Sequence, residues 1–187
     1  MKGKIFNAQE VQAMLNGSKV IFREVIKPQP IQPEGFSDAY FDCYNKGNQW
    51  NWWTKDNKQL LGQIVKCPYQ VGQKIFCKEV FGEDWFNDIC YKATDQADYA
   101  VSSWKPAQHM KQEHSRLTLL IKEIRVERLA ELSEEDAIKE GVMNDLRIVH
   151  YHPVEYFRQH WNATHKKPEE KFEASPFVWV ISFEVVK

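Results

Sequence analysis

Large apolar residues alternate with other residues over two long segments, and this pattern predicts two long strands. Over Phe177–Val186 every second side chain is large and apolar, so this segment is expected to form the final strand. The segment Leu117–Leu129 alternates at both ends but not around Leu119–Ile121, which predicts a bulge or corner near Lys122 and Glu123. Shorter strands are expected at residues 4–6, 20–26, 74–80 and 89–92.

Capping residues predict three short helices. Asn7, with a glutamate three residues later, forms a capping box, and Gly17 ends this first helix. Ser133 opens a second helix that Gly141 ends, and Pro153 suits the first position of a third. Many strands with three short helices indicate an α+β domain built around a small barrel. The third helix is expected to place four large side chains on one face: Tyr156, Phe157, His160 and Trp161.

The segment from about residue 31 to 60 is an aromatic-rich insertion in what is otherwise a single domain over residues 1–187. Residues 39–44 and 49–53 are rich in aromatic side chains and flank a polar turn, which predicts a hairpin turning at Lys46-Gly47. Its tryptophans have two interpretations. They can stack on a base or meet a protein partner, or they can cap one open end of the barrel as part of the core.

Composition describes an ordinary globular protein. Its 187 residues are 43% hydrophobic and 27% charged, with a net charge of −1. Because no global basic field is present, any contact with nucleic acid must come from a local patch. The four cysteines include no Cys-x-x-Cys pair, the N-terminus lacks an apolar targeting segment, and no stretch approaches membrane-spanning length. We expect a cytoplasmic protein with reduced thiols and no membrane partner.

Neither a metal nor a cofactor is expected. The pairs His150 with His152 and His109 with His114 do not supply the three or four closely spaced ligands that zinc requires. The sequence also lacks a Walker motif and the glycine pattern of a dinucleotide-binding turn.

Four segments, in order, carry a resemblance to a known family, and the segment of the final strand fits it as well. Gly17–Arg23 fits the pattern Gly-x-Lys-x-x-x-Arg, and Trp179–Phe183 fits the closing strand. The protein resembles the long phage and prophage branch of the ASCH family, and the likeness covers nearly everything outside residues 31–60. The resemblance implies a small β-barrel of the PUA-like superfamily that binds RNA or a nucleotide. The other matching segments are Cys67–Glu79, Trp104–Arg116 and Arg125–Gly141.

The resemblance also implies candidate catalytic residues. ASCH proteins with amidohydrolase activity on acetylated cytidine use a lysine, a threonine three residues later and a glutamate near the end of the short helix. Lys19 and Glu140 match the lysine and the glutamate, but Phe22 stands at the threonine position. A hydroxyl nucleophile is needed for that route, so Phe22 argues against hydrolysis. Without the resemblance, the preferred interpretation is that Lys19 is a solvated lysine at a helix end and Glu140 an exposed helix residue.

Further side chains in the matched segments form a candidate ligand-binding group. Cations can hold a phosphate or a base edge, and rings can add a stacking wall. The alternative is that the cations form salt bridges with Glu24, Glu79 and Glu113. The group consists of Arg23, Lys78, Trp104, Lys105, His109 and Arg116.

We therefore expect RNA or a nucleotide in a cleft between the Lys19 corner, the Lys78 strand and the Glu140 helix. Lys19, Arg23 and Glu140 would hold it, with Glu140 accepting a hydrogen bond from an exocyclic amine. Two other functions stay open. One is an amidohydrolase that removes an acyl group from a modified nucleoside such as N4-acetylcytidine. The other is a non-catalytic accessory module that meets a protein partner through residues 31–60.

Overall fold

The computed structural model describes residues 1–43, 48–56, 62–95, 101–142 and 152–186. The described part is a mixed α+β fold, and it contains the three predicted helices: α1 (Ala8–Leu15), α2 (Glu134–Lys139) and α3 (Pro153–Thr164). The predicted caps are confirmed. Asn7 and Glu10 form the capping box of α1, and the hydroxyl of Ser133 accepts from the N–H of Asp136 at 3.1 Å.

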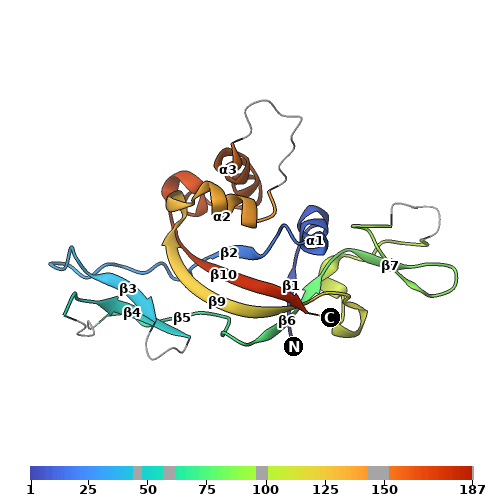
Figure 1. The fold of residues 1–187 in the computed structure, drawn as a ribbon, viewed down its shortest axis with the longest axis horizontal. Coiled ribbons are helices and arrows are strands. Elements are labelled where there is room, and N and C mark those ends of the chain that lie inside the picture. Colours follow the sequence, from blue (N-terminus) through green and yellow to red (C-terminus); the bar gives the residue numbers. More distant parts are fainter. Residues whose placement is uncertain (44–47, 57–61, 96–100, 143–151, 187) are drawn as a thin grey trace.

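Five strands form the main sheet, in the order β1-β6-β9-β10-β2. The two longest, β9 and β10, run side by side through its middle, and α2 and α3 lie on one side of it (Figure 1). β1 runs parallel to β6, and every other neighbouring pair is antiparallel. The strands are β1 (Lys2–Ile5), β2 (Ile21–Val25), β6 (Lys74–Lys78), β9 (Thr118–Arg128) and β10 (Phe177–Val186).

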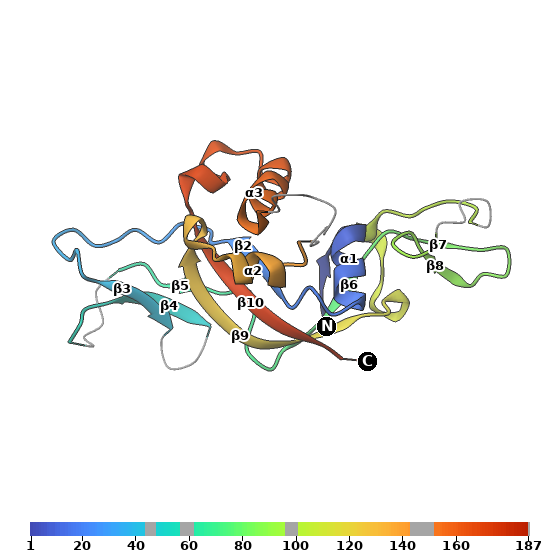
Figure 2. The same ribbon diagram turned by 45° about the horizontal axis from the view of Figure 1, so that its top comes forward.

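Two small sheets extend from the main one at opposite ends of the molecule (Figure 2). One contains β3 (Tyr40–Cys43), β4 (Gln49–Trp53) and β5 (Val65–Lys66). The other contains β7 (Phe81–Glu83) and β8 (Ile89–Tyr91). Short 3₁₀ helices lie at Ala107–His109, Gln112–His114, Leu129–Glu131, Pro168–Glu170 and Phe172–Ala174.

The predicted bulge in the long strand is confirmed. Ser182 of β10 pairs with Glu123, whereas the next residue, Phe183, pairs with Ile121. Lys122 is therefore the extra residue in β9. A bulge of this kind bends the strand and restores the alternation on its far side.

β1 and β2 are the two edges of the main sheet, and side chains bring them together. The ammonium of Lys4 binds the carboxylate of Glu24, and the rings of Phe6 and Phe22 meet edge to face with centroids 5.8 Å apart. Over the described ranges, no backbone pairing joins β1 to β2, so a closed barrel is not found.

The main sheet has a hydrophobic cluster on each face. Successive residues of β2 point to opposite faces, so Phe22 enters the larger cluster and Ile21 the smaller one beneath α2 and α3. The smaller cluster includes Phe157 and Trp161 of α3. Both helices are therefore fixed to the sheet by packing on the side that also carries the side chain of Arg23.

The aromatic insertion contributes to the core. β3 and β4 form the predicted antiparallel hairpin, whereas its predicted turn at Lys46-Gly47 lies outside the described residues. Trp50 and Trp52 are buried, and Trp50 meets Trp179 edge to face at 5.2 Å. For these two tryptophans the core interpretation is confirmed. A contact between residues 31–60 and a protein partner stays a prediction.

Gly141 allows the end of α2 to approach the segment before β2. It has a φ of +79°, and a Cβ built there would lie 2.6 Å from the Cβ of Ala13 and 2.8 Å from the Cβ of Lys19. Both the left-handed backbone and the close approach therefore require glycine here. Gly17, at the end of α1, has the same φ of +79° but nothing within 4 Å of such a Cβ.

Gly17 and Gly141 form a matched pair for a stability test. Gly17→Ala is expected to lower the free energy of unfolding by about 1 kcal/mol, because only the left-handed backbone is strained. Gly141→Ala should cost about 1–3 kcal/mol more, since it also overpacks the contact with Ala13 and Lys19. Urea unfolding of both variants measures the difference. Equal losses would show that the close approach is unimportant.

Two cysteines are buried in the larger cluster, and both carry perturbed thiols. Burial raises the pKa of Cys67 from 9.0 to about 11. Burial also raises the pKa of Cys77, with the nearby Glu79 carboxylate adding to the effect. Both thiols are therefore protonated at neutral pH and shielded from reagents.

Cys67 should make stability depend on pH in the alkaline range. Between pH 9 and about 11 the unfolded state loses the Cys67 proton while the folded state keeps it. Because the folded state then binds more protons, the free energy of unfolding falls as the pH rises through this window. Chemical unfolding at several pH values, compared with Cys67→Ala, measures the effect. An equally steep fall in the variant would contradict this origin.

Candidate functional site

A pocket of about 630 Å³ lies beside the edge of β2 that has no neighbouring strand. This volume falls in the usual range for small-molecule sites. The wall residues come from five elements: β1 and α1 on one side, β2 at the base, and the end of α2 with α3 on the other. The wall includes Lys4, Gln9, Glu10, Lys19, Phe22, Arg23, Glu24, Val25, Lys27, Glu140, Tyr156, His160, Trp161 and His165.

Lys19 is held at the inner end of this pocket, and only 2% of it is exposed. Its N–H donates to the carbonyl of Ala13 at 3.0 Å, which fixes the corner between α1 and β2. Its ammonium donates to both the carboxylate and the backbone carbonyl of Glu140, each at 2.8 Å, and lies 3.5 Å from the carboxylate of Glu10. The alternative that Lys19 is a solvated surface lysine is therefore wrong.

Glu140 is the C-cap residue of α2, and it is also buried. One carboxylate oxygen accepts from Lys19, and the other accepts from the guanidinium of Arg23 at 2.9 Å. The alternative that Glu140 is an exposed helix residue is therefore wrong as well. Lys19 and Arg23, four residues apart, thus converge on one buried carboxylate that lies more than a hundred residues away in the sequence.

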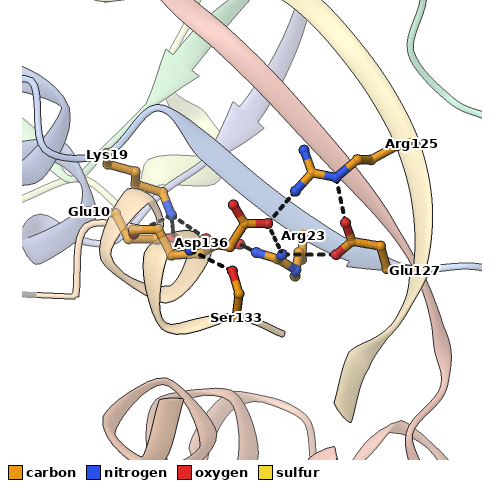
Figure 3. A network of polar contacts seen from close by, with 8 residues as sticks. Glu10, Lys19, Arg23, Arg125, Glu127, Ser133 and Asp136 are labelled. Atoms are coloured by element: carbon orange, nitrogen blue, oxygen red, sulfur yellow. Dashed lines mark hydrogen bonds and ion pairs between the residues drawn. The ribbon is translucent and has the colours of Figure 1, made fainter. Parts of the chain in front are cut away.

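Arg23 extends this contact into a network of charges (Figure 3). Its guanidinium also donates to Asp136 at 3.0 Å and to Glu127 at 3.1 Å, and Arg125 donates to the same two carboxylates from the outer side. Removing one member of a buried ion pair leaves its partner uncompensated, so the network fixes the relative positions of β2, β9 and α2.

Phe22 contributes its ring to the pocket wall and to the core, and it supplies no hydroxyl. The ring meets Tyr69 edge to face at 5.5 Å, and the ammonium of Lys4 lies 4.6 Å from its centroid. The hydroxyl of Tyr69 donates to Glu24 at 2.7 Å. Burial, together with the Glu24 carboxylate, raises the pKa of Tyr69, so this hydroxyl keeps its proton.

α3 lines the opposite wall with stacked rings. Tyr156 and His160 stack with centroids 4.4 Å apart, and Trp161 and His165 stack at 3.8 Å. A ring nitrogen of His160 lies 3.3 Å from the amide oxygen of the Gln9 side chain on α1. The predicted common face of α3 is thus partly core and partly pocket wall.

The pocket that contains Lys19 and Glu140 is bordered by α3 rather than by the Lys78 strand. The ammonium of Lys78 donates to the carbonyl of Gln108 at 2.8 Å. Arg116 makes two hydrogen bonds to the buried carboxylate of Glu79, at 2.9 and 2.8 Å, which confirms the salt-bridge alternative for this residue. The structure therefore separates five expected ligand-binding residues from the pocket: Lys78, Trp104, Lys105, His109 and Arg116.

Each lysine or arginine in the pocket wall already has a carboxylate partner. Lys4 binds Glu24, and Lys27 binds Glu170 at 2.7 Å, in addition to the contacts of Lys19 and Arg23. The hydrogen bond from Lys27 lowers the pKa of Glu170. A phosphate entering the pocket would compete with these carboxylates, whereas an uncharged polar group would not.

Sequence reasoning missed several residues of the site. Asp136 was predicted only to lie within the second helix, although an acidic first turn facing a strand arginine is a usable signal. The ring pairs of α3 have a helical spacing of four residues that the sequence does show. Gln9, Glu10 and Glu127 carry no local signal that distinguishes them from surface residues.

Searches of protein-family models, of curated proteins and of solved structures find no match for this protein. Within the described ranges, no helix is long and apolar enough to cross a membrane. Across the same ranges, no group of three or more histidine, cysteine, aspartate or glutamate side chains is placed to hold a metal ion.

Arg23 and Arg125 allow the buried network to be tested against a matched control. Both bind Glu127 and Asp136, but the side chain of Arg23 is 1% exposed and that of Arg125 is 32% exposed. Arg23→Met should lower the free energy of unfolding by about 3 kcal/mol or more, because it removes one of the two cations that hold the buried carboxylate of Glu140. Arg125→Met should cost less than about 1 kcal/mol. Similar losses of unfolding free energy in the two variants would contradict the conclusion that burial makes Arg23 the more important arginine.

Proposed function

We propose that this protein is an ASCH protein of phage or prophage type that binds RNA or a nucleotide by taking the nucleobase into the pocket beside β2. The observation that carries the proposal is the 2.8 Å contact between Lys19 and Glu140 inside this pocket. These are the lysine and glutamate that the family resemblance assigns to the catalytic site of its amidohydrolases, and a buried carboxylate in a pocket is a suitable acceptor for a base amine.

The arrangement of charges around Glu140 supports a nucleobase rather than a phosphate at this end of the pocket. The carboxylate of Glu140 uses one lone pair of each oxygen for Lys19 and Arg23, and further lone pairs remain. The two cations hold the carboxylate in place, so it can accept from an exocyclic amine without reorganising. The carbonyl oxygen that uracil has at this position carries no proton, so it cannot donate a hydrogen bond to the carboxylate.

The aromatic rings of α3 support the same proposal. The ring pairs Tyr156 with His160 and Trp161 with His165 border the pocket that contains Glu140. A base stacked on an aromatic side chain gains about 1–3 kcal/mol, largely irrespective of its identity. In this proposal the rings supply affinity and Glu140 supplies selectivity.

The curled main sheet supports a PUA-like architecture. Its edge strands approach through the contacts of Lys4 with Glu24 and of Phe6 with Phe22. In this proposal the sheet is the barrel of the superfamily with a gap between β1 and β2, and the ligand enters at that gap.

Hydrolysis of an acylated nucleoside is the second candidate, because Lys19 and Glu140 meet as that activity requires. Two features count against it. Phe22 replaces the threonine of the resemblance with a ring buried in the core, and the ammonium of Lys19 is a donor in both of its contacts with Glu140. A nucleophile and a base are both needed for such a step. We therefore propose binding without cleavage.

Calorimetric titration with nucleosides tests the binding. Cytidine, with an exocyclic amine, should bind at least tenfold more tightly than uridine, since one good hydrogen bond to a base edge discriminates by about 1–3 kcal/mol. Glu140→Gln should reduce this preference, whereas Glu113→Gln, at an exposed position outside the pocket wall, should not. Absence of binding to any nucleoside, or an unchanged preference in Glu140→Gln, would contradict the proposal.

Incubation with N4-acetylcytidine separates binding from hydrolysis. We expect the protein to release no acetate, because the wall position that carries a threonine nucleophile in the resemblance is occupied by Phe22. Chromatography of the nucleoside after incubation measures this. Turnover that disappears in both Lys19→Ala and Glu140→Ala would instead establish the amidohydrolase.

A further inference from the structure

The backbone of β2 presents unused hydrogen-bonding groups along the pocket. Ile26 donates its N–H to the carbonyl of Phe177 at 3.0 Å, and Val20 accepts from the N–H of Phe183 at 2.9 Å. Even-numbered residues of β2 therefore bond to β10, and the antiparallel pattern turns Arg23 and Val25 the other way. Because β2 is the last strand of the sheet, these two residues direct their N–H and C=O groups to its open edge.

These groups lack partners in the part of the protein that the structure describes. Its hydrogen bonds involve neither the backbone N–H nor the backbone C=O of Arg23 or Val25 at the open edge. Arg23 is buried and Val25 is half-buried, and both line the pocket. The Nε of Arg23 is also buried without a partner. A polar ligand that enters the pocket can therefore pair with these backbone groups, which otherwise depend on water for their hydrogen bonds.

The end of α2 covers the first part of the edge and leaves the rest open. Val20 donates its N–H to the carbonyl of Lys139 at 2.9 Å, and Lys19 forms a bridge with Glu140. The open stretch follows directly after this contact. Val25 lies two residues beyond Arg23, which is about 7 Å along a strand. A ligand whose base meets Glu140 beside Arg23 therefore extends its sugar towards Val25.

The groups near Val25 favour a neutral partner that both donates and accepts. Each ribose hydroxyl has one proton and two lone pairs, which match a backbone C=O and N–H. A phosphate could use only the N–H, and the pocket-wall ammonium groups of Lys4 and Lys27 are already held by Glu24 and Glu170. We propose that the backbone N–H and C=O of Val25 bind the ribose hydroxyls, so that the site selects ribonucleosides over deoxyribonucleosides.

This inference rests on the proposed function but fails separately from it. Titration of the unmodified protein with cytidine and with 2′-deoxycytidine should show at least tenfold weaker binding of the deoxy form, as expected for the loss of one buried hydrogen bond. If neither nucleoside binds, the proposed function is wrong and this inference falls with it. If both bind equally, only the inference is overturned.

Val25→Pro removes the N–H that faces the open edge and leaves the ladder to β10 intact, which is where proline is tolerated in a sheet. The ribose preference should fall to less than threefold in Val25→Pro and remain in Val25→Ala, which keeps the N–H. A full preference in a folded Val25→Pro variant would overturn the proposal.

Amide hydrogen exchange of the unmodified protein covers the case in which Val25→Pro does not fold. Exchange at the N–H of Val25 should slow at least tenfold in saturating cytidine and much less in saturating 2′-deoxycytidine. The reason is that only ribose has the 2′-hydroxyl needed to occupy both backbone groups of Val25. Equal exchange of this N–H with the two nucleosides would overturn the proposal.

Discussion

The structure depends on one buried carboxylate. Glu140, at the end of α2, is held between the ammonium of Lys19 and the guanidinium of Arg23 at 2.8 and 2.9 Å. Without the carboxylate of Glu140, the buried charges of Lys19 and Arg23 would have to be neutralised or exposed to water. The corner after α1, the edge strand β2 and the helix α2 must therefore take up their observed positions together. Glycine at position 141 makes the approach sterically possible.

The same constraint gives the site its chemical character. Holding a carboxylate between two fixed cations costs desolvation energy, and hydrophobic side chains of similar volume would serve stability as well or better. A charged network of this kind beside a pocket supports our proposal that the carboxylate is preorganised for a ligand. Stacked rings on α3 and the open backbone edge of β2 surround this carboxylate with a stacking surface and with further donors and acceptors.

Local signals in the sequence predicted the elements well, and long-range placement poorly. The caps at Asn7 and Ser133 and the bulge at Lys122 depend on a few neighbouring residues, so a local pattern in the sequence is enough to predict them. Burial of Lys19 depends instead on a close approach by Gly141, over a hundred residues away. Lys78 and Arg116 were expected beside the ligand but lie outside the wall of the Lys19–Glu140 pocket, because order along the sequence does not determine which strands border a pocket.

A crystal structure with cytidine tests the central claim most directly. The account predicts that the exocyclic nitrogen of cytosine lies about 2.9 Å from the carboxylate of Glu140, with Lys19 and Arg23 still bound to that carboxylate. Cytidine bound away from this pocket, or bound with its sugar rather than its base towards Glu140, would contradict it.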